Sequence, residues 1–323
     1  MNDINAIFEK VKAQAKALNI LFSTNIAPNV EINTRAVQQK MEKNFIIEGE
    51  IMENRNGLIC PVCGAGLVYA DKTYRCKNGH AYDQARQGYV NLLPVQSKHS
   101  LHPGDTKEML LARRAFLNGG YYQPIAESVV QALEQYLPKS TSLLLDVGCG
   151  EGYYTAYMEK KLGISCIGAD ISKDGVKMAC SRNKSIQWIV ATASHLPLAD
   201  NTADAVTAMF ALFLPDEYAR VLKKGGIVVE VTVASEHLHE MKNIIYNEVF
   251  PQEKYPAPCG EKFEELSCEK HTFQCSLDNT ALVHLLRMTP HFWRIHQERR
   301  EQLEKTEGLT ITAAYWVRVL RKK

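Results

Sequence analysis

The stretch Leu143–Thr155, LLLDVGCGEGYYT, decides the fold of this chain. It begins as an apolar run that predicts a buried strand, and it continues into three glycines at alternate positions, Gly148, Gly150 and Gly152. Glycines directly after a buried strand allow the chain to turn sharply and allow a ligand to approach the backbone closely. Asp146 precedes them, so the pattern is D-x-G-x-G-x-G. The nicotinamide-binding pattern G-x-G-x-x-G does not fit, because Tyr153 occupies its third glycine position.

Two later segments extend this pattern. Asp170 ends the next predicted strand, about 20 residues after the glycines, where an acid can accept hydrogen bonds from both hydroxyls of a ribose. The segment 194–196 follows the third strand, where an adenine would lie. Together, these features resemble the class I S-adenosylmethionine-dependent methyltransferases. The alternative is a nucleotide-binding fold without methyl transfer.

The surrounding sequence predicts an α/β fold. Five apolar segments rich in β-branched residues alternate with helix-length segments, which indicates a mostly parallel sheet; these are SLLLDVG, SCIGADIS, IQWIVAT, ADAVTAMF and GIVVEVTV. TITAAYWVRVL, residues 310–320, predicts a closing antiparallel strand. Two helices are expected before the sheet, one with Asp105 as N-cap and Glu108 three residues later, and another over residues 124–136.

A second motif, CPVCGAGLVYADKTYRCKNGH, predicts a metal site. Its potential ligands follow C-x-x-C, twelve residues and C-x-x-x-H, which places a close pair on each turn of a hairpin; they are Cys60, Cys63, Cys76 and His80. Thiolate and imidazole ligands in this number suit tetrahedral Zn²⁺, and four protein ligands leave no open position for water. The site is therefore expected to be structural. The alternative is two buried cysteines with an incidental histidine.

Composition limits the classes that remain. The chain has 323 residues, which favours two units, and hydrophobic residues make up 46%, enough for a substantial core. The net charge is +2, so an RNA-binding protein of this composition would have to gather its Lys and Arg on one face. The charged start of the chain predicts no signal peptide, and no apolar run is long enough to span a bilayer. We expect a cytoplasmic, reducing compartment and no membrane partner, where clustered cysteines bind metal.

The order of these segments resembles one family, the large-subunit ribosomal RNA guanine-N1 methyltransferases of the RlmA type. The resemblance extends from about Ile59 to the C-terminus. Besides the cysteine motif and the glycine loop, it is carried by GYVNLLPVQ, PGD, ARRAFLNGGYYQP, IYNEV and MTPHFWR. The segment AMFALFLPDEY departs from the family pattern where the target base should enter.

The resemblance implies a zinc module that helps to recognise a hairpin of 23S rRNA, and a domain that methylates guanine with S-adenosylmethionine. By matching position it implies cofactor contacts from Tyr122, Gly150, Glu151 and His237. Some members of the family confer resistance to tylosin-type macrolides. Whether the chain is a monomer or a homodimer stays open.

The mechanism requires three further kinds of residue. Guanine N1 must lose a proton, and the carboxylates expected near the crevice are Asp204, Glu230 and Glu236. The extruded base could stack on an aromatic ring, for which the choices are Phe210, Phe213 and Trp293. Expected phosphate contacts are Lys77, Arg86, Lys98, Arg113 and Arg114, although a solvated helix face explains the last two equally well.

The predicted organisation is a helical extension over residues 1–57, a zinc module over 58–96, connecting helices over 97–140 and a methyltransferase domain over 141–323. Two other functions remain possible on sequence alone. One is a small-molecule methyltransferase whose zinc module is only a lid. The other is a non-catalytic RNA-binding protein.

Overall fold

The computed structural model describes residues 44–47, 50–53, 57–94, 104–138, 140–141, 143–249 and 255–323. The chain divides into two units, residues 1–46 and 47–323. Most of the helical extension expected over residues 1–57 lies outside the described residues. Within that extension, β1 (Asn44–Ile47) and β2 (Glu50–Glu53) are strands, so the expectation of a helical segment is wrong for these residues.

The second unit is built on an eight-stranded sheet of order β12-β13-β11-β10-β7-β8-β9-β6. Neighbours from β11 to β6 are parallel, whereas β13 is antiparallel to both β11 and β12. The bounds are β6 (Val90–Asn91), β7 (Leu143–Val147), β8 (Ser165–Asp170), β9 (Gln187–Val190), β10 (Ala203–Met209), β11 (Leu222–Val233), β12 (Phe263–Asp278) and β13 (Gly308–Lys322). The predicted α/β class and the antiparallel closing strand are confirmed.

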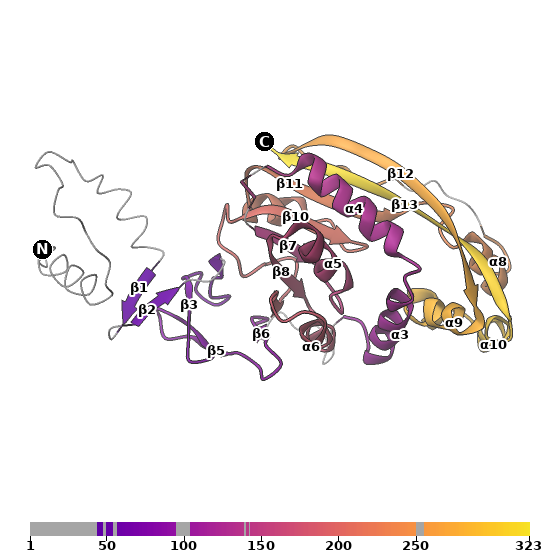
Figure 1. The fold of residues 1–323 in the computed structure, drawn as a ribbon, viewed down its shortest axis with the longest axis horizontal. Helices are drawn as coiled ribbons and strands as arrows, with labels where there is room; N and C mark the ends of the chain where they lie inside the picture. Colours follow the sequence, from indigo (N-terminus) through magenta and orange to yellow (C-terminus); the bar gives the residue numbers. More distant parts are fainter. Residues whose placement is uncertain are drawn as a thin grey trace, which may run out of the picture. The chain divides into compact units, whose positions relative to one another are not determined.

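Helices connect the parallel strands and extend the far end of the sheet. They are α3 (Lys107–Asn118), α4 (Gln123–Tyr136), α5 (Tyr153–Leu162), α6 (Lys173–Arg182), α7 (Pro215–Val221), α8 (His239–Ile245), α9 (Asn279–Arg287), η3 (Pro290–Trp293) and α10 (Gln297–Glu304). Figure 1 shows the long β12–β13 hairpin reaching from the C-terminus to α9 and α10, which lie between its two strands in the sequence. No helix among the described residues combines the length and apolar character needed to cross a bilayer.

The N-terminus of α3 differs from the prediction in one detail. Thr106, and not Asp105, is the N-cap residue, and its hydroxyl accepts a hydrogen bond from the Met109 amide at 3.3 Å. The Asp105 carboxylate instead forms an ion pair with Arg113 at 2.5 Å. Both residue types are good N-caps, so the sequence pattern alone could not separate them.

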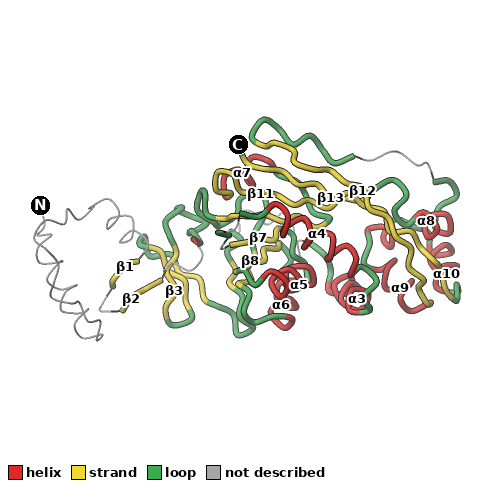
Figure 2. The backbone as a smooth tube through the Cα atoms, turned by 45° about the horizontal axis from the view of Figure 1, so that its top comes forward, coloured by secondary structure: helices red, strands yellow, loops and turns green. Residues whose placement is uncertain are grey.

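Alternation along the strands gives the sheet two buried faces. In β7, Leu144 belongs to one apolar cluster, whereas Leu143 and Leu145 belong to the other. Because successive side chains of a strand point to opposite faces, such a strand is apolar throughout and must be covered on both sides. Helices α4, α5 and α6 cover the first face, and Figure 2 shows them on the same side of β7 and β8.

The second face is covered partly by the cysteine-rich segment. This segment forms a three-stranded antiparallel sheet of β3 (Leu67–Ala70), β4 (Thr73–Cys76) and β5 (Ala81–Asp83). Leu58, Leu67 and Tyr74 are buried in the same cluster as the β7 side chains. The segment then contributes β6, which pairs with β9 at the sheet edge. The cysteine module and the α/β domain therefore share a core.

The glycine loop lies where the strand order reverses direction. From β7 the chain adds β8 and β9 on one side of the sheet, and it then returns to add β10 and β11 on the other. Such a reversal leaves a crevice at the carboxyl ends of the strands, which is where ligands bind in open α/β sheets. Ala179 of α6 and Trp188 of β9 pack closely against the loop. A Cβ on Gly152 would lie 2.8 Å from both Ala179 Cβ and the Trp188 ring, so there is no space for a side chain at this position.

Candidate metal centre and cofactor crevice

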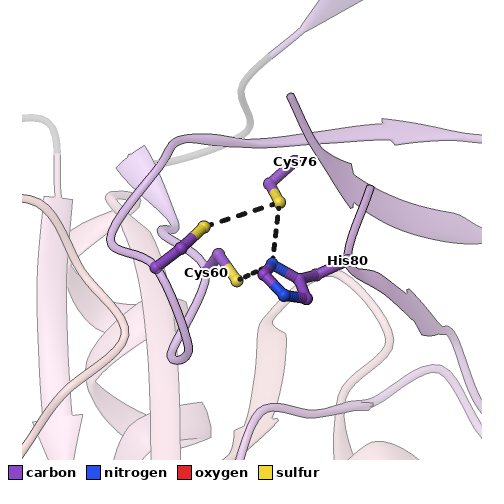
Figure 3. A group of neighbouring side chains, drawn as sticks. Cys60, Cys76 and His80 are labelled. Carbon is purple, nitrogen blue, oxygen red and sulfur yellow. Dashed lines mark hydrogen bonds between the residues drawn. The ribbon is translucent and has the colours of Figure 1, made fainter. Parts of the chain in front are cut away.

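The structure brings the four predicted metal ligands together. Their ligand atoms all lie within 4.8 Å of one another. The Sγ atoms of Cys60 and Cys76 are each 3.4 Å from Nδ1 of His80, and Figure 3 shows these three side chains pointing toward one another. Cys63 Sγ lies 3.7 Å from Cys76 Sγ. Tetrahedral zinc with bonds of about 2.3 Å to sulfur and 2.0 Å to nitrogen separates its ligand atoms by about 3.5–3.8 Å, so the residues fit this ion.

Two turns position these ligands. In the first, the Gly64 amide donates to the Cys60 carbonyl at 2.8 Å, and in the second the Gly79 amide donates to the Cys76 carbonyl at 3.0 Å. Both glycines have positive φ, +71° and +87°, a conformation that disfavours other residues. The predicted hairpin between the two ligand pairs is β3–β4.

Groups beside Cys60 and Cys63 favour thiolates, whereas burial raises the pKa of the Cys76 thiol. The Tyr82 hydroxyl lies 3.1 Å from Cys60 Sγ, where it can donate a hydrogen bond to a metal-bound sulfur. A backbone hydrogen bond from Ala65 lowers the pKa of the Cys63 thiol to about 6. Tyr82 was not predicted as part of the site, and only its position two residues after His80 could have suggested it.

Asp146 braces the glycine loop from inside the sheet. Its two carboxylate oxygens accept hydrogen bonds from Thr155 Oγ1 at 2.5 Å and Thr207 Oγ1 at 2.8 Å. The side chain is 1% exposed, and burial raises its pKa to about 6. Asp146 therefore connects β7 to the start of α5 and to β10, which fixes the loop between them. The sequence signal for Thr207 is a hydroxyl between apolar residues in the middle of a buried strand.

Asp170 fixes the middle of the glycine loop at Gly150. One carboxylate oxygen accepts from the Gly150 amide at 2.8 Å, and the other accepts from the Ser172 amide at 2.7 Å. Burial raises the pKa of Asp170, and these two backbone donors oppose that effect. Each carboxylate oxygen has a second acceptor position. Asp170 can therefore keep the loop in place and accept a further hydrogen bond from a ribose.

The Glu151 side chain is buried and forms ion pairs with two arginines, Arg114 and Arg182. Its Oε2 accepts from Arg114 Nε at 3.0 Å and pairs with Arg182 Nη2 at 2.5 Å, and the side chain is 1% exposed. Its Oε1 has no hydrogen-bond partner among the residues that the structure describes. Arg114 also donates to the Met178 carbonyl and to Ser181. Arg114, one of the expected phosphate contacts, links α3 to α6 and to the loop.

Arg113 also lies at the loop. Its guanidinium bonds Asp105 and the Met288 carbonyl, and a Cβ on Gly150 would lie 3.4 Å from its Nη1. Both arginines predicted for RNA thus help to assemble the cofactor crevice. The other two described candidates, Lys77 and Arg86, are exposed on the cysteine module, and Lys98 lies outside the described residues.

Tyr122 and His237 form a buried pair, although they are 115 positions apart in the sequence. The Ala314 amide donates to His237 Nδ1 at 3.3 Å, which assigns the ring proton to Nε2. Nε2 lies 3.3 Å from the Tyr122 hydroxyl and can donate to it. Tyr122 then keeps its own hydroxyl proton for another acceptor. Burial lowers the pKa of His237 to about 3, so the ring is neutral at neutral pH.

This shift predicts an acid-sensitive contribution to stability. An unfolded chain protonates His237 with an ordinary pKa of 6.5, whereas the folded chain does so only near 3. Acidification below pH 6.5 therefore favours the unfolded state. The stability advantage of the wild type over His237→Gln should shrink by about 2 kcal/mol between pH 7 and pH 5. Urea unfolding of both proteins at each pH measures it, and a difference that does not change with pH would contradict the burial of a neutral ring.

The three carboxylates expected at the crevice lie in different places. Asp204 sits at the amino end of β10, where it accepts from the Leu143 amide and pairs with Lys223 at 2.7 Å. The amino ends of the strands lie at the opposite end of the sheet from the glycine loop, so the expected position of Asp204 at the crevice was wrong. Asp204 is the second residue of a parallel strand, and because the crevice lies at the carboxyl ends of such strands, its place along the strand already argued against this expectation.

Glu230 and Glu236 are both committed to ion pairs. Glu230 lies within β11 and is 3% exposed, and it forms two hydrogen bonds with Arg318 of β13. Glu236 follows β11 on the surface and pairs with Lys270 at 2.5 Å. The hydrogen bond from Lys270 lowers the pKa of Glu236 to about 2, which makes it a weak proton acceptor.

Comparisons with known proteins agree with these two sites. A family model described as "RlmA, N-terminal" matches residues 58–101, and one described as "Methyltransferase domain" matches residues 145–229. The chain is 32% identical over 250 residues to the 23S rRNA (guanine(748)-N(1))-methyltransferase of Streptomyces fradiae, covering 76% of this chain and 88% of the relative. It is 30% identical over 281 residues to a Micromonospora griseorubida protein whose name assigns it provisionally to the 23S rRNA (guanine-N(1)-)-methyltransferases, covering 80% and 94%.

The first relative matches 76% of this chain, and the two family models place the cysteine module before the methyltransferase domain in the same chain. A match to either module alone would show only a zinc ribbon or only a methyltransferase fold. Because both occur together and in order, the chain belongs to the 23S rRNA (guanine-N1)-methyltransferase family.

Proposed function

We propose that this protein transfers the methyl group of S-adenosylmethionine to N1 of a guanine in 23S rRNA. The observation that carries the proposal is the joint presence of the zinc cluster and the glycine crevice on one shared core, in a chain of this family. A lid for small substrates would not need a core in common with the sheet.

The crevice residues have separate roles in holding the methyl donor. The glycine loop lets the donor approach the backbone, Asp170 accepts from the ribose hydroxyls, and Tyr122 offers the hydroxyl proton that His237 leaves free. Bound S-adenosylmethionine supplies an electrophilic methyl group on a sulfonium. What the protein contributes is position and a fixed electrostatic environment, since displacement at a methyl group needs the reacting atoms aligned and close.

The guanine must lose its N1 proton as the methyl group arrives. None of the three carboxylates considered is a suitable proton acceptor. Asp204 lies at the amino end of β10, away from the crevice, and Glu230 is paired with Arg318. Glu236 has a pKa of about 2. We therefore propose that proton loss goes to solvent at the open mouth of the crevice and that rate acceleration comes from positioning. An N1 position is hidden in a paired stem, so the base must be extruded or taken from a loop.

The cysteine module is proposed to contact the rRNA hairpin. Lys77 and Arg86 are exposed on it and can approach phosphates. Zinc bound by Cys60, Cys63, Cys76 and His80 would fix the shape of the module and take no part in the reaction. Further parts of the proposal are action in the cytoplasm and, if the modified guanine lies in the macrolide site, resistance to tylosin-type macrolides.

The test is methylation of unmodified 23S rRNA with labelled S-adenosylmethionine. We expect one labelled guanine, found as a single stop of reverse transcription, because a methyl group on N1 blocks base pairing. The position of that stop identifies the guanine. Label incorporated only into small molecules, or at another atom of the base, would contradict the proposal.

A further inference from the structure

Phe210 has an unusual backbone conformation at the carboxyl end of β10. Its φ is +54°, a region in which a bulky side chain is sterically disfavoured. The surroundings hold it there: its amide donates to the Val231 carbonyl at 2.9 Å, and a Cβ on Gly148 would lie 2.8 Å from Ala211 Cβ. Strain that the fold maintains is found preferentially at functional sites.

This conformation leaves the Phe210 ring open to solvent beside the cofactor crevice. The residue is 39% exposed, and its ring centroid lies 6.3 Å from that of His237, with 33° between the ring planes. His237 in turn contacts Tyr122. Leu212, two residues later, is 75% exposed. A partly exposed aromatic ring therefore lies beside the Tyr122–His237 pair, directly after β10.

The other two aromatic candidates occupy different environments. The Phe213 ring packs among Tyr218, Phe263 and Arg318, at 5.8, 6.1 and 5.1 Å. Trp293 is 55% exposed, but it lies against α3, where its Nε1 is 3.3 Å from Met109 Sδ, and it lines a groove with Leu111 and His284. Of the three, Phe210 alone lies beside the Tyr122–His237 pair.

We propose that Phe210 is the surface on which the target guanine stacks, and that it sets the angle at which N1 meets the methyl group. This inference rests on the proposed function. A guanine presents a broad π face, and stacking on an aromatic ring would hold an extruded base while leaving its N1 edge free. Phe210 adopts this positive φ directly after β10, and its ring lies 6.3 Å from that of His237.

The experiment compares Phe210 variants in single-turnover methylation of 23S rRNA, with RNA and S-adenosylmethionine both saturating. Phe210→Tyr keeps a π face and should stay within about 3-fold of the wild type. Phe210→Leu and Phe210→Ala should slow methyl transfer by about 10- to 100-fold, the range expected from losing one base–aromatic stack. Phe210→Gly should lose as much, although glycine is comfortable at positive φ, so a strained or unfolded backbone cannot explain the loss.

Two further measurements separate stacking from indirect effects. Affinity for S-adenosylmethionine and the melting temperature of Phe210→Gly should match the wild type, and Trp293→Ala should keep the wild-type single-turnover rate. An active wild type with an equally active Phe210→Ala would overturn the stacking role alone, as would a Leu variant equal to the Tyr variant. A wild type that methylates no guanine of the RNA would overturn both this inference and the proposed function.

Discussion

Replacement of Cys76 by serine is expected to release the zinc ion and to lower the free energy of unfolding by about 5 kcal/mol or more. Zinc binding to small modules is worth about 10 kcal/mol or more, and that binding energy is folding energy. In this chain the effect should extend beyond the module. Cys60 and Cys76 belong to the same buried cluster as Leu145 of β7, and the module supplies β6 at the sheet edge. Unfolding the module therefore exposes one face of the sheet.

Metal analysis and thermal unfolding measure this effect together. The wild type should hold one zinc per chain, and Cys76→Ser should hold less and unfold at a much lower temperature, with the α/β domain following the module. Cys180→Ser is the matched control, because Cys180 of α6 is buried in the other apolar cluster and is not one of the four metal ligands. It should keep its zinc and lose only about 1 kcal/mol. A wild type without zinc, or a Cys76→Ser protein as stable as the control, would refute the metal site.

Removal of the Asp170 carboxylate is expected to weaken binding of S-adenosylmethionine by at least about 100-fold. Asp170→Ala loses the acceptor for the ribose, and it also leaves the Gly150 and Ser172 amides without the carboxylate that now accepts from them. A hydrogen bond to a charged group is worth about 1.5–3 kcal/mol, so losing the ribose contact and the loop contacts together accounts for this factor. Asp170→Asn keeps part of the acceptor capacity and should lose about 10-fold.

Isothermal titration with S-adenosylmethionine gives these affinities directly. Asp174, four residues later in α6 and exposed, provides the control: Asp174→Ala removes a carboxylate of the same region and should bind normally. If Asp170→Ala binds within 3-fold of the wild type, the ribose is not held by this residue. Since titration does not involve RNA, its outcome is independent of the substrate proposal.

Local patterns were sufficient to identify much of this protein. The metal ligands come in close pairs on two turns, and the loop Gly148–Gly152 directly follows a strand whose apolar character is visible in the sequence. Such features depend on neighbours a few residues away, so spacing reports them. The βαβ order and the antiparallel closing strand follow from the same short-range periodicity and from the handedness rules that limit how strands connect.

Long-range pairing decided the roles of the charged side chains. Arg114 was equally suited to phosphate or to solvent in the sequence, and the structure pairs it with Glu151, 37 positions away. Asp204 lies on the predicted strand but at its amino end, beside Leu143, whereas the crevice lies at the carboxyl ends of the strands. Glu151 and Leu143 are both far from their partners in the sequence, so no local pattern indicates either contact. The same is true of the Tyr122–His237 pair. The family resemblance implied that each residue contacts the cofactor, but it did not suggest that they contact each other.

The sequence by itself determined the metal ligand set, the glycine loop and the class of fold, because each is fixed by spacing along a few consecutive turns of chain. Only the tertiary structure decided that the zinc module shares a core with the sheet, and that Phe210 turns its ring toward His237. The physical reason is that burial and ion pairing are settled by segments that meet after folding, and the order of residues along a chain does not specify which segments will meet.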